Sequence, residues 1–172
     1  MISAITNEMG QKREIIMTGM SFAIVDEYKD TIYRTALTVT GNFADAEDIT
    51  QEVFLKYFQF RPEFETKAHE KAWLLRVTIN SGKNLLRSVW HSRRGEIDLT
   101  QIPQPENEKH PEVLQAVLSL PEKYRIAIYL YYYEEYSIQE IAGITGRTQT
   151  AIAQHLSRGR AKLRKKLGGG KS

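Results

Sequence analysis

"SIQEIAGITGRTQTAIAQHLSRGRAKLRKKL", residues Ser137 to Leu167, is the stretch that decides the fold. Its pattern predicts two short helices joined by a glycine turn. Ser137 and Glu140 have the spacing of a capping box, which marks the start of the first helix. Gly146 suits the turn, and Thr148 can cap the helix that follows. The stretch therefore predicts a helix-turn-helix.

The second helix of this stretch combines an apolar stripe with a basic surface. The stripe recurs at steps of three and four and should pack inward; it consists of Ile152, Leu156, Gly159, Leu163 and Leu167. In a helix-turn-helix the start of the second helix enters the major groove of DNA, where glutamine can pair with adenine and arginine with guanine. The candidates on that face are Arg147, Gln149, Thr150, Ala153, Gln154 and His155. Later basic residues, among them Arg158 and Arg160, suit phosphate contacts.

The composition sets broad limits. The chain has 172 residues, enough for one domain or two small ones, and contains no cysteine. Disulfides, thiolate zinc sites and a cysteine nucleophile are thereby excluded. No apolar run approaches the roughly 20 residues that span a bilayer, and the N-terminus lacks the pattern of a secretory signal. We therefore expect a cytoplasmic protein without an integral membrane segment.

Charge is unevenly distributed, although the net charge is only +3. Residues 44–65 are acidic, whereas residues 67–94 and 155–172 are basic. One acidic and two basic surfaces indicate partners of different charge. The alternative is that these runs are ordinary solvated helix faces.

The first half of the chain predicts a loose extension followed by a helix. Residues 1–19 are polar and weakly patterned, with room for one short helix at most. From Phe22 onward apolar residues recur at helical steps as far as Val39. Gly41 suits the left-handed position that ends such a helix.

Two more helices are expected before residue 93. One starts near Ala44 and cannot continue through Pro62. A polar loop, residues 61–70, leads to a long helix from about Glu70 to Ser92, in which Gly82 is a weak point.

The rest of the chain predicts a linker and a second helical domain. Residues 93–110 contain glycine, two prolines and many charges, which is typical of a flexible linker. Pro111 suits a first helical position, and residues 119–122 have the spacing of another capping box. The predicted fold is all-α, with two small helical domains (residues 20–92 and 111–167) joined by that linker and followed by a flexible tail, residues 168–172.

Three segments together resemble a known family. "DAEDITQEVFLKYF", residues 45–58, resembles the polymerase-binding segment of bacterial RNA polymerase sigma factors. "AWLLRVTINSGKNLLR", residues 72–87, resembles their promoter-melting segment. "LPEKYRIAIYLYYYEEYSIQEIA", residues 120–142, with the helix that follows, resembles their C-terminal domain. The order and spacing resemble the extracytoplasmic-function (ECF) group, which keeps only these two domains.

The resemblance implies an interface with core RNA polymerase on the second helix. The implied residues are Asp48, Gln51, Glu52, Phe54 and Leu55. An acidic surface can orient a basic partner and speed its association. Spacing suggests that either Phe54 or Leu55 faces the core, and it leaves open which one.

The long helix and the loop before it are implied to open the minus-ten promoter element and to capture the non-template strand. Flipping a base costs a few kcal/mol, which stacking and phosphate contacts can offset. The implied residues are Phe64, Thr66, Lys67, His69, Arg76, Asn80, Lys83, Asn84 and Arg87. Trp73 is interpreted as a core residue because its neighbours on the same stripe are apolar.

The helix-turn-helix is implied to bind the minus-thirty-five element, and here the chain departs from the family pattern. Ala153-Gln154-His155 replaces the Lys-Ser-Arg or Arg-Ser-Arg of many members. Losing two cations should weaken phosphate anchoring. We expect sequence preference to depend instead on Gln154, Gln149 and Arg147.

Two other classes of function compete with the sigma-factor interpretation. A stand-alone helix-turn-helix regulator of duplex DNA would explain residues 137–167 but not the acidic second helix. An enzyme is not expected, because no phosphate-binding loop or metal-ligand spacing occurs, and we expect no metal and no cofactor. The resemblance further implies an anti-sigma protein as a partner.

Overall fold

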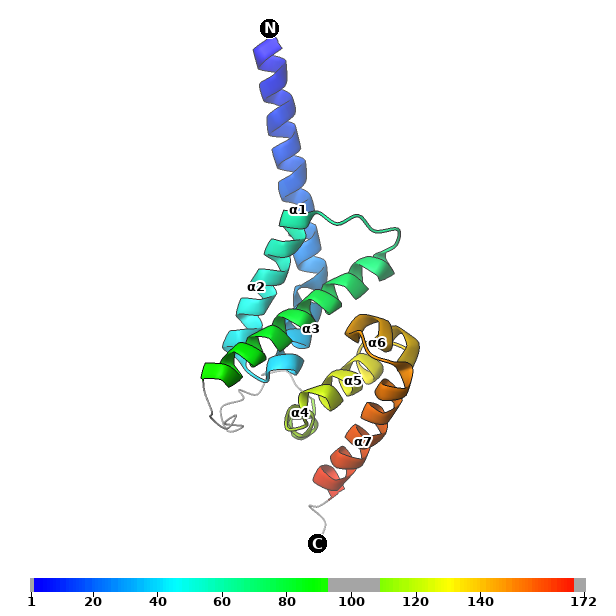
Figure 1. Ribbon diagram of the computed structural model, residues 1–172. Helices are drawn as coiled ribbons and strands as arrows, with labels where there is room; N and C mark the ends of the chain where they lie inside the picture. The colour runs from blue at the N-terminus through cyan, green and yellow to red at the C-terminus, as the bar shows by residue number, and fades with distance from the viewer. Residues whose placement is uncertain (1, 93–108, 169–172) are drawn as a thin grey trace.

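The computed structural model describes residues 2–92 and 109–168, and of residues 2–18, 20, 21 and 89–92 it describes the backbone alone. The described residues form helices without a strand, which confirms the predicted all-α class. In Figure 1, α1, α2 and α3 lie together, and α4 to α7 form a second group beside them. The predicted linker lies almost entirely outside the described residues, as does the tail after Gly168. The helices are α1 (Ile2–Thr40), α2 (Phe43–Phe60), α3 (Lys67–Ser92), α4 (Pro111–Leu118), α5 (Glu122–Tyr132), α6 (Ile138–Thr145) and α7 (Gln149–Gly168).

The first domain is a bundle of the later part of α1 with α2 and α3. Its core includes Ile32, Ile49 and Leu74, all of which are almost fully buried. The side chain of Asn42 caps α2 by accepting a hydrogen bond from the Asp45 amide. Arg61 ends α2 in a left-handed conformation, with φ 44°, directly before Pro62. The sequence predicted these boundaries to within one or two residues.

The sequence predicts a loose extension at residues 1–19, whereas in the structure α1 begins at Ile2 and continues as one helix (Figure 1). No proline interrupts this stretch, and extending an existing helix is far easier than nucleating one. Phe22 also departs from the expected inward stripe. Its side chain is 67% exposed.

Gly82 allows α3 to approach α1 closely and is not a weak point. A Cβ atom at this position would lie 2.6 Å from Cγ1 of Val39, a fully buried side chain. Such a distance is far inside van der Waals contact. The glycine therefore sets the spacing between the two helices.

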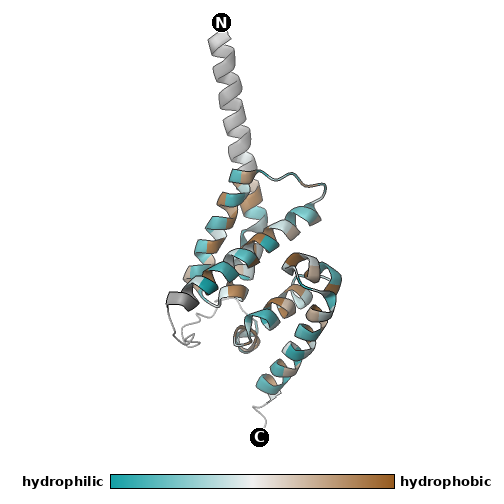
Figure 2. Cartoon of the chain, viewed as in Figure 1, coloured by the Kyte–Doolittle hydropathy of each residue, from teal (hydrophilic) through white to brown (hydrophobic). Residues whose placement is uncertain are grey.

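The second domain contains the predicted helix-turn-helix, formed by α6 and α7. Ser137 and Glu140 make both hydrogen bonds of the capping box, which confirms the predicted start of α6. Gly146 follows α6 with φ 66°, and the hydroxyl of Thr148 accepts a hydrogen bond from the Ala151 amide. Figure 2 shows α7 as largely hydrophilic. Its buried stripe ends early, because Leu167 is 46% exposed.

The second predicted capping box, residues 119–122, is absent. Pro121, not Ser119, is the N-cap of α5, and no side chain caps that end. The hydroxyl of Ser119 donates to the carbonyl of Ala116, because Ser119 ends α4 and does not begin α5. The prediction that Pro111 begins a helix is confirmed.

One buried apolar cluster, separate from the core of the first domain, contains residues of both domains. Val39, Leu75 and Ile79 of the first domain belong to the same buried cluster as Leu130 and Leu156 of the second. The sequence predicted two domains on a linker, but it gave no sign of this packing. The packing turns parts of α1 and α3 toward α5 and α6 (Figure 1).

Arg125 is the principal polar contact between the domains. It is 5% exposed, and its guanidinium donates to the carbonyls of Thr38 and Val39 at the end of α1. It also donates to the carbonyls of Leu118 and Leu120. The last carbonyls of a helix lack intrahelical partners and carry partial negative charge, so a buried cation is well placed there.

Candidate nucleic-acid and polymerase interfaces

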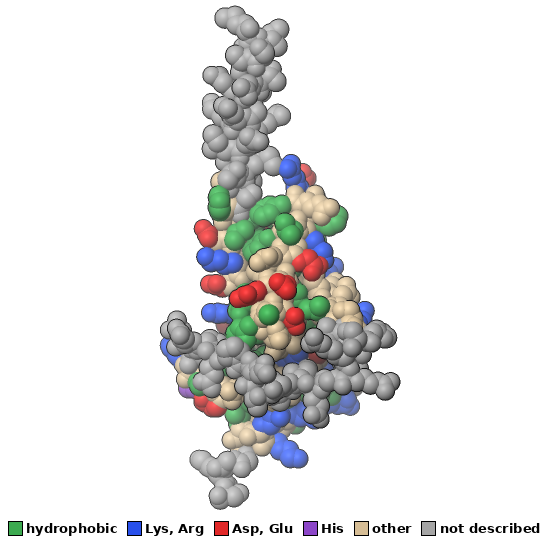
Figure 3. Space-filling model, turned by 90° about the vertical axis from the view of Figure 1, so that its left-hand side faces the viewer, with side chains coloured by type: hydrophobic (Ala, Val, Ile, Leu, Met, Phe, Trp, Pro, Cys, Tyr) green, Lys and Arg blue, Asp and Glu red, His purple; other side chains and the backbone are tan. Residues whose placement is uncertain are grey.

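The outer face of α2 carries an acidic and apolar surface. Asp48, Gln51, Glu52 and Leu55 are all exposed, and their spacing of three and four places them on one helical face. Leu55 is 68% exposed and is the apolar member of this otherwise polar face. Figure 3 shows acidic and hydrophobic side chains side by side on this side of the molecule. These four residues are called the α2 face below.

Phe54 does not belong to the α2 face, which corrects the expectation for this residue. It is 8% exposed, lies in the core of the first domain and stacks on Phe58. Helical geometry places Phe54 and Leu55 about 100° apart, so only one of them can face solvent.

Glu52 is held in place on the α2 face. Its carboxylate lies 2.5 Å from Nζ of Lys56 and accepts a hydrogen bond from the hydroxyl of Ser81 on α3. The hydrogen bond from Lys56 lowers the pKa of Glu52, with a smaller contribution from Ser81, against the opposing effect of burial. The carboxylate therefore stays charged at neutral pH.

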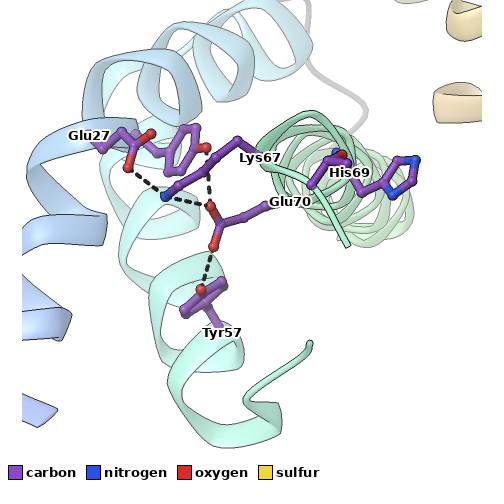
Figure 4. Close-up of polar contacts among 7 residues, drawn as sticks. Glu27, Tyr57, Lys67, His69 and Glu70 are labelled. Atoms are coloured by element: carbon purple, nitrogen blue, oxygen red, sulfur yellow. Dashed lines mark hydrogen bonds and ion pairs between the residues drawn. The ribbon is translucent and has the colours of Figure 1, made fainter. Parts of the chain in front are cut away.

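A buried carboxylate organises the start of α3 (Figure 4). Glu70 accepts hydrogen bonds from the hydroxyls of Tyr57 on α2, at 2.6 Å, and Tyr28 on α1, at 3.2 Å. Lys67 donates to the same carboxylate at 3.0 Å and to Glu27 at 2.9 Å. These five residues, which we call the Glu70 cluster, tie the first turn of α3 to both other helices of the bundle.

The Glu70 cluster keeps its central carboxylate ionised. Burial would raise the pKa of Glu70, but the hydrogen bonds from Tyr57 and Lys67 outweigh it and hold that pKa below its ordinary value. The pKa of Tyr57 is shifted in the opposite direction. Burial, followed by the hydrogen bond to Glu70, raises it to about 12. Lys67, which the resemblance assigns to the minus-ten element, forms two ion pairs in the free protein while most of its side chain stays exposed.

The other loop residues surround this cluster. His69 is exposed, and Figure 4 shows its ring pointing away from the carboxylates. The hydroxyl of Thr66 accepts from the His69 amide and so caps α3. Phe64 is half-buried against Trp73, with ring centroids 5.8 Å apart, and Trp73 in turn contacts Tyr57. This arrangement confirms Trp73 as a packing residue.

Further along α3, the predicted polar residues form one helical face. Arg76, Asn80, Asn84 and Arg87 are exposed, whereas Lys83 is half-buried. Part of this face meets the second domain. Arg76 donates to the carbonyl of Gly143 on α6 at 2.6 Å.

The predicted base-contacting residues gather at the start of α7. Arg147, Gln149, Thr150, Ala153 and Gln154 are all exposed there. Farther along α7, Arg158 is exposed, and Arg160 donates to the hydroxyl of Tyr132 at the end of α5. The start of α7 therefore offers an amide and an arginine close together, the chemistry that reads adenine and guanine.

His155 is buried, which corrects its assignment to this face. It is 8% exposed and makes an edge contact with Tyr124 of α5. It follows Ile152 by three residues and precedes Leu156, so it shares their inward side of the helix. Many family members have an arginine at this position, whereas the histidine of this chain packs against α5.

Sequence reasoning missed Arg125, although one signal was available. It is the only charged residue between Lys123 and Glu134, within an otherwise apolar and aromatic run. A charged residue in such a run is a candidate for a buried polar contact. Within the described residues, no helix is long and apolar enough to cross a membrane, and no group of side chains has the composition of a metal site.

Comparisons with known proteins agree with this domain structure. The family model of Sigma-70 region 2 matches residues 24–92, and that of Sigma-70 region 4 matches residues 110–163. The sigma factor RpoE from Bartonella quintana, solved in complex with the anti-sigma factor NepR, has the same fold. Its TM-score is 0.71 at 22% identity, with 85% of this chain and 95% of that chain covered. The two domains in this order define a sigma-70 type protein.

Curated relatives narrow the family further. SigW of Bacillus subtilis, an ECF RNA polymerase sigma factor, is 32% identical over 162 residues, which cover 84% of this chain and 87% of SigW. SigE of Mycolicibacterium smegmatis is also 32% identical, over 157 residues, but the match spans 59% of its length. The chain belongs to the ECF RNA polymerase sigma factors.

Proposed function

We propose that this chain binds core RNA polymerase through the α2 face and directs it to a two-part promoter. The observation that carries this proposal is the exposure of Leu55 among Asp48, Gln51 and Glu52. An apolar side chain ringed by acids fits a partner surface with a pocket and basic residues around it. The protein acts as a specificity subunit with no chemistry of its own, in the cytoplasm.

The promoter contacts fall to the two other faces. The loop before α3 and the exposed residues Asn80, Asn84 and Arg87 contact the opened minus-ten element. The start of α7, above all Gln154, Gln149 and Arg147, contacts the minus-thirty-five element. Support comes from their common exposure, whereas the buried His155 is excluded from the minus-thirty-five contacts.

A charge reversal on the α2 face tests the polymerase contact. We expect Asp48→Arg to weaken binding of the purified protein to core polymerase at least tenfold, because a like charge then meets a basic partner. Asp30→Arg is the matched control, since Asp30 is exposed on α1 and outside the α2 face. Unchanged binding by Asp48→Arg would refute this assignment of the interface.

We also propose that an anti-sigma protein regulates the chain, since the structurally similar RpoE of Bartonella quintana forms a complex with the anti-sigma factor NepR. The α2 face is the surface such a protein would cover to block polymerase. Competition between core polymerase and a captured partner, measured with and without Asp48→Arg, tests this proposal.

A further inference from the structure

A small hollow lies where the two domains meet. Its walls come from α3, α5, the end of α6 with the turn that follows, and the first half of α7. It has room for about one water-sized group. The residues around it are Lys83, Lys123, Ile126, Ala127, Thr145, Arg147, Ile152 and His155.

The charged residues around the hollow are almost all of one sign. Within the described part of the chain, Lys83, Lys123 and Arg147 take part in no ion pair. Arg87 and Arg158 add to the positive field, and Glu122 is the acid that acts on Lys83. Burial first, and then Arg147 and Arg87, lowers the pKa of Lys83. We call the contact surface between the two domains the seam. Bringing these cations together across the seam costs free energy unless an anion accompanies them.

The ring of His155, which lines the same hollow, has a buried nitrogen atom without a hydrogen-bond partner among the described residues. It lines the hollow and is 92% buried, by its exposed fraction of 8%. Its Nδ1 atom makes no hydrogen bond to any described residue. A buried nitrogen without a partner is rare in folded proteins and calls for a ligand or a water molecule.

We propose that this hollow is a phosphate-binding site that bridges the two domains. One oxygen of the phosphate enters the hollow near His155, while the others face Lys83 of the first domain and Lys123 and Arg147 of the second. Charge-assisted hydrogen bonds from several cations are the usual means of holding a phosphate group. The ligand class is inorganic phosphate or a phosphomonoester.

Such a site would favour the packed arrangement of the domains. A phosphate held by both domains stabilises the state in which they touch, because the site is complete only there. The family resemblance assigns Lys83 and Arg147 to promoter DNA, so the ligand and DNA would compete for them. This inference goes beyond the proposed function and does not depend on it, since it concerns binding by the free protein.

Calorimetric titration of the free protein with inorganic phosphate, against chloride at equal ionic strength, tests the site. We expect saturable phosphate binding that Lys83→Gln and Arg147→Gln each weaken about tenfold, the loss of one charge-assisted hydrogen bond. Lys162→Gln, which removes an exposed cation of α7 away from the hollow, should bind as the unaltered protein does. Circular dichroism melting verifies that each variant is folded, and Lys83→Arg should retain binding. Titration with a nucleoside monophosphate distinguishes a phosphomonoester from free phosphate.

The bridging role has its own measurement. Because the chain lacks cysteine, Ala44→Cys and Ala161→Cys allow two dyes to report the interdomain distance by energy transfer. Phosphate should increase the population with a short distance, and Lys83→Gln should abolish this response. The site would be overturned if chloride bound as tightly as phosphate. It would also be overturned if Lys162→Gln weakened phosphate binding as much as Lys83→Gln and Arg147→Gln do. An interdomain distance that does not respond to bound phosphate would overturn the bridging role.

Discussion

At the scale of single residues, a few buried polar groups determine where the functional faces lie. Glu70 fixes the start of α3 by accepting from one tyrosine on α1 and one on α2. The positions of the exposed His69 and the cap residue Thr66 depend on this first turn of α3 being anchored. Glu70 is therefore a positioning residue for the loop, although it is too buried to touch DNA.

Glu70→Gln should destabilise the protein by about 1–3 kcal/mol at pH 7, because the amide cannot replace the charge-assisted hydrogen bonds. The pKa of Glu70 is lowered in the folded state, so its contribution is present above the ordinary value of 4.5 and is lost as the pH falls below it. The difference in unfolding free energy between the two proteins, measured in urea, should shrink below pH 4.5. Glu65→Gln, an exposed loop control, should show neither effect. A difference independent of pH would argue against a charged Glu70.

Gly82→Ala is expected to destabilise the protein although alanine favours helices. The new methyl group would meet Val39 at 2.6 Å, and overpacking of this kind costs about 1–3 kcal/mol. That cost exceeds the gain of about 1 kcal/mol in helix propensity. Gly143→Ala on α6 is the control, since nothing lies within 4 Å of its added methyl group, and it should stabilise. Equal melting shifts for both variants would contradict the close approach of α3 to α1.

At the scale of helices, local chemistry predicted most boundaries. The Ser137–Glu140 capping box, Thr148 and Gly146 act within one turn of the chain, so their pattern is visible in the sequence. Ser119 failed as a cap because two adjacent helix ends compete for it, which spacing alone cannot resolve. Spacing left open whether Phe54 or Leu55 faces the core, because that depends on which helix packs against α2. His155, by contrast, lies three residues after Ile152 and next to Leu156, so the spacing of the inward stripe could have indicated its burial.

Helix α7 contains the residues that we propose determine promoter choice. Gln154→Ala should change which minus-thirty-five sequences are preferred, because the exposed amide can pair with adenine. Arg158→Gln should instead weaken binding to all sequences about equally and reduce its salt dependence, as expected of a phosphate contact. Selection from a randomised promoter library by the reconstituted polymerase measures both effects. An unchanged preference with Gln154→Ala would place base recognition elsewhere.

At the scale of the whole molecule, the free protein holds its domains together. Arg125 joins α5 to the last carbonyls of α1, Lys71 pairs with Glu134 at 2.6 Å, and Arg76 bonds to Gly143. Arg76 and Lys83, which the family resemblance assigns to the minus-ten element, lie where the two domains meet. If these residues contact promoter DNA as the resemblance implies, we expect the contact between the domains to loosen when the protein engages a promoter.

Arg125→Gln should shift the free protein toward separated domains. The shorter glutamine amide cannot reach all the carbonyls that Arg125 binds. Each carbonyl that stays buried without a hydrogen bond destabilises the packed state by about 1–3 kcal/mol. Separation of the domains lets water bind these carbonyls, so it removes that cost. Small-angle X-ray scattering should then show a larger radius of gyration. Arg76→Gln, which removes an exposed contact in the same seam, should have a smaller effect. An unchanged radius for Arg125→Gln would show that the apolar contacts alone hold the domains.

The most direct test of the central claim is reconstituted transcription from fragmented genomic DNA, with transcript 5′ ends mapped for core polymerase alone and with this protein. The account predicts new start sites, each preceded by the same two sequence elements and lost with Asp48→Arg. Retained binding to duplex DNA without new start sites would contradict it and would identify a stand-alone helix-turn-helix regulator.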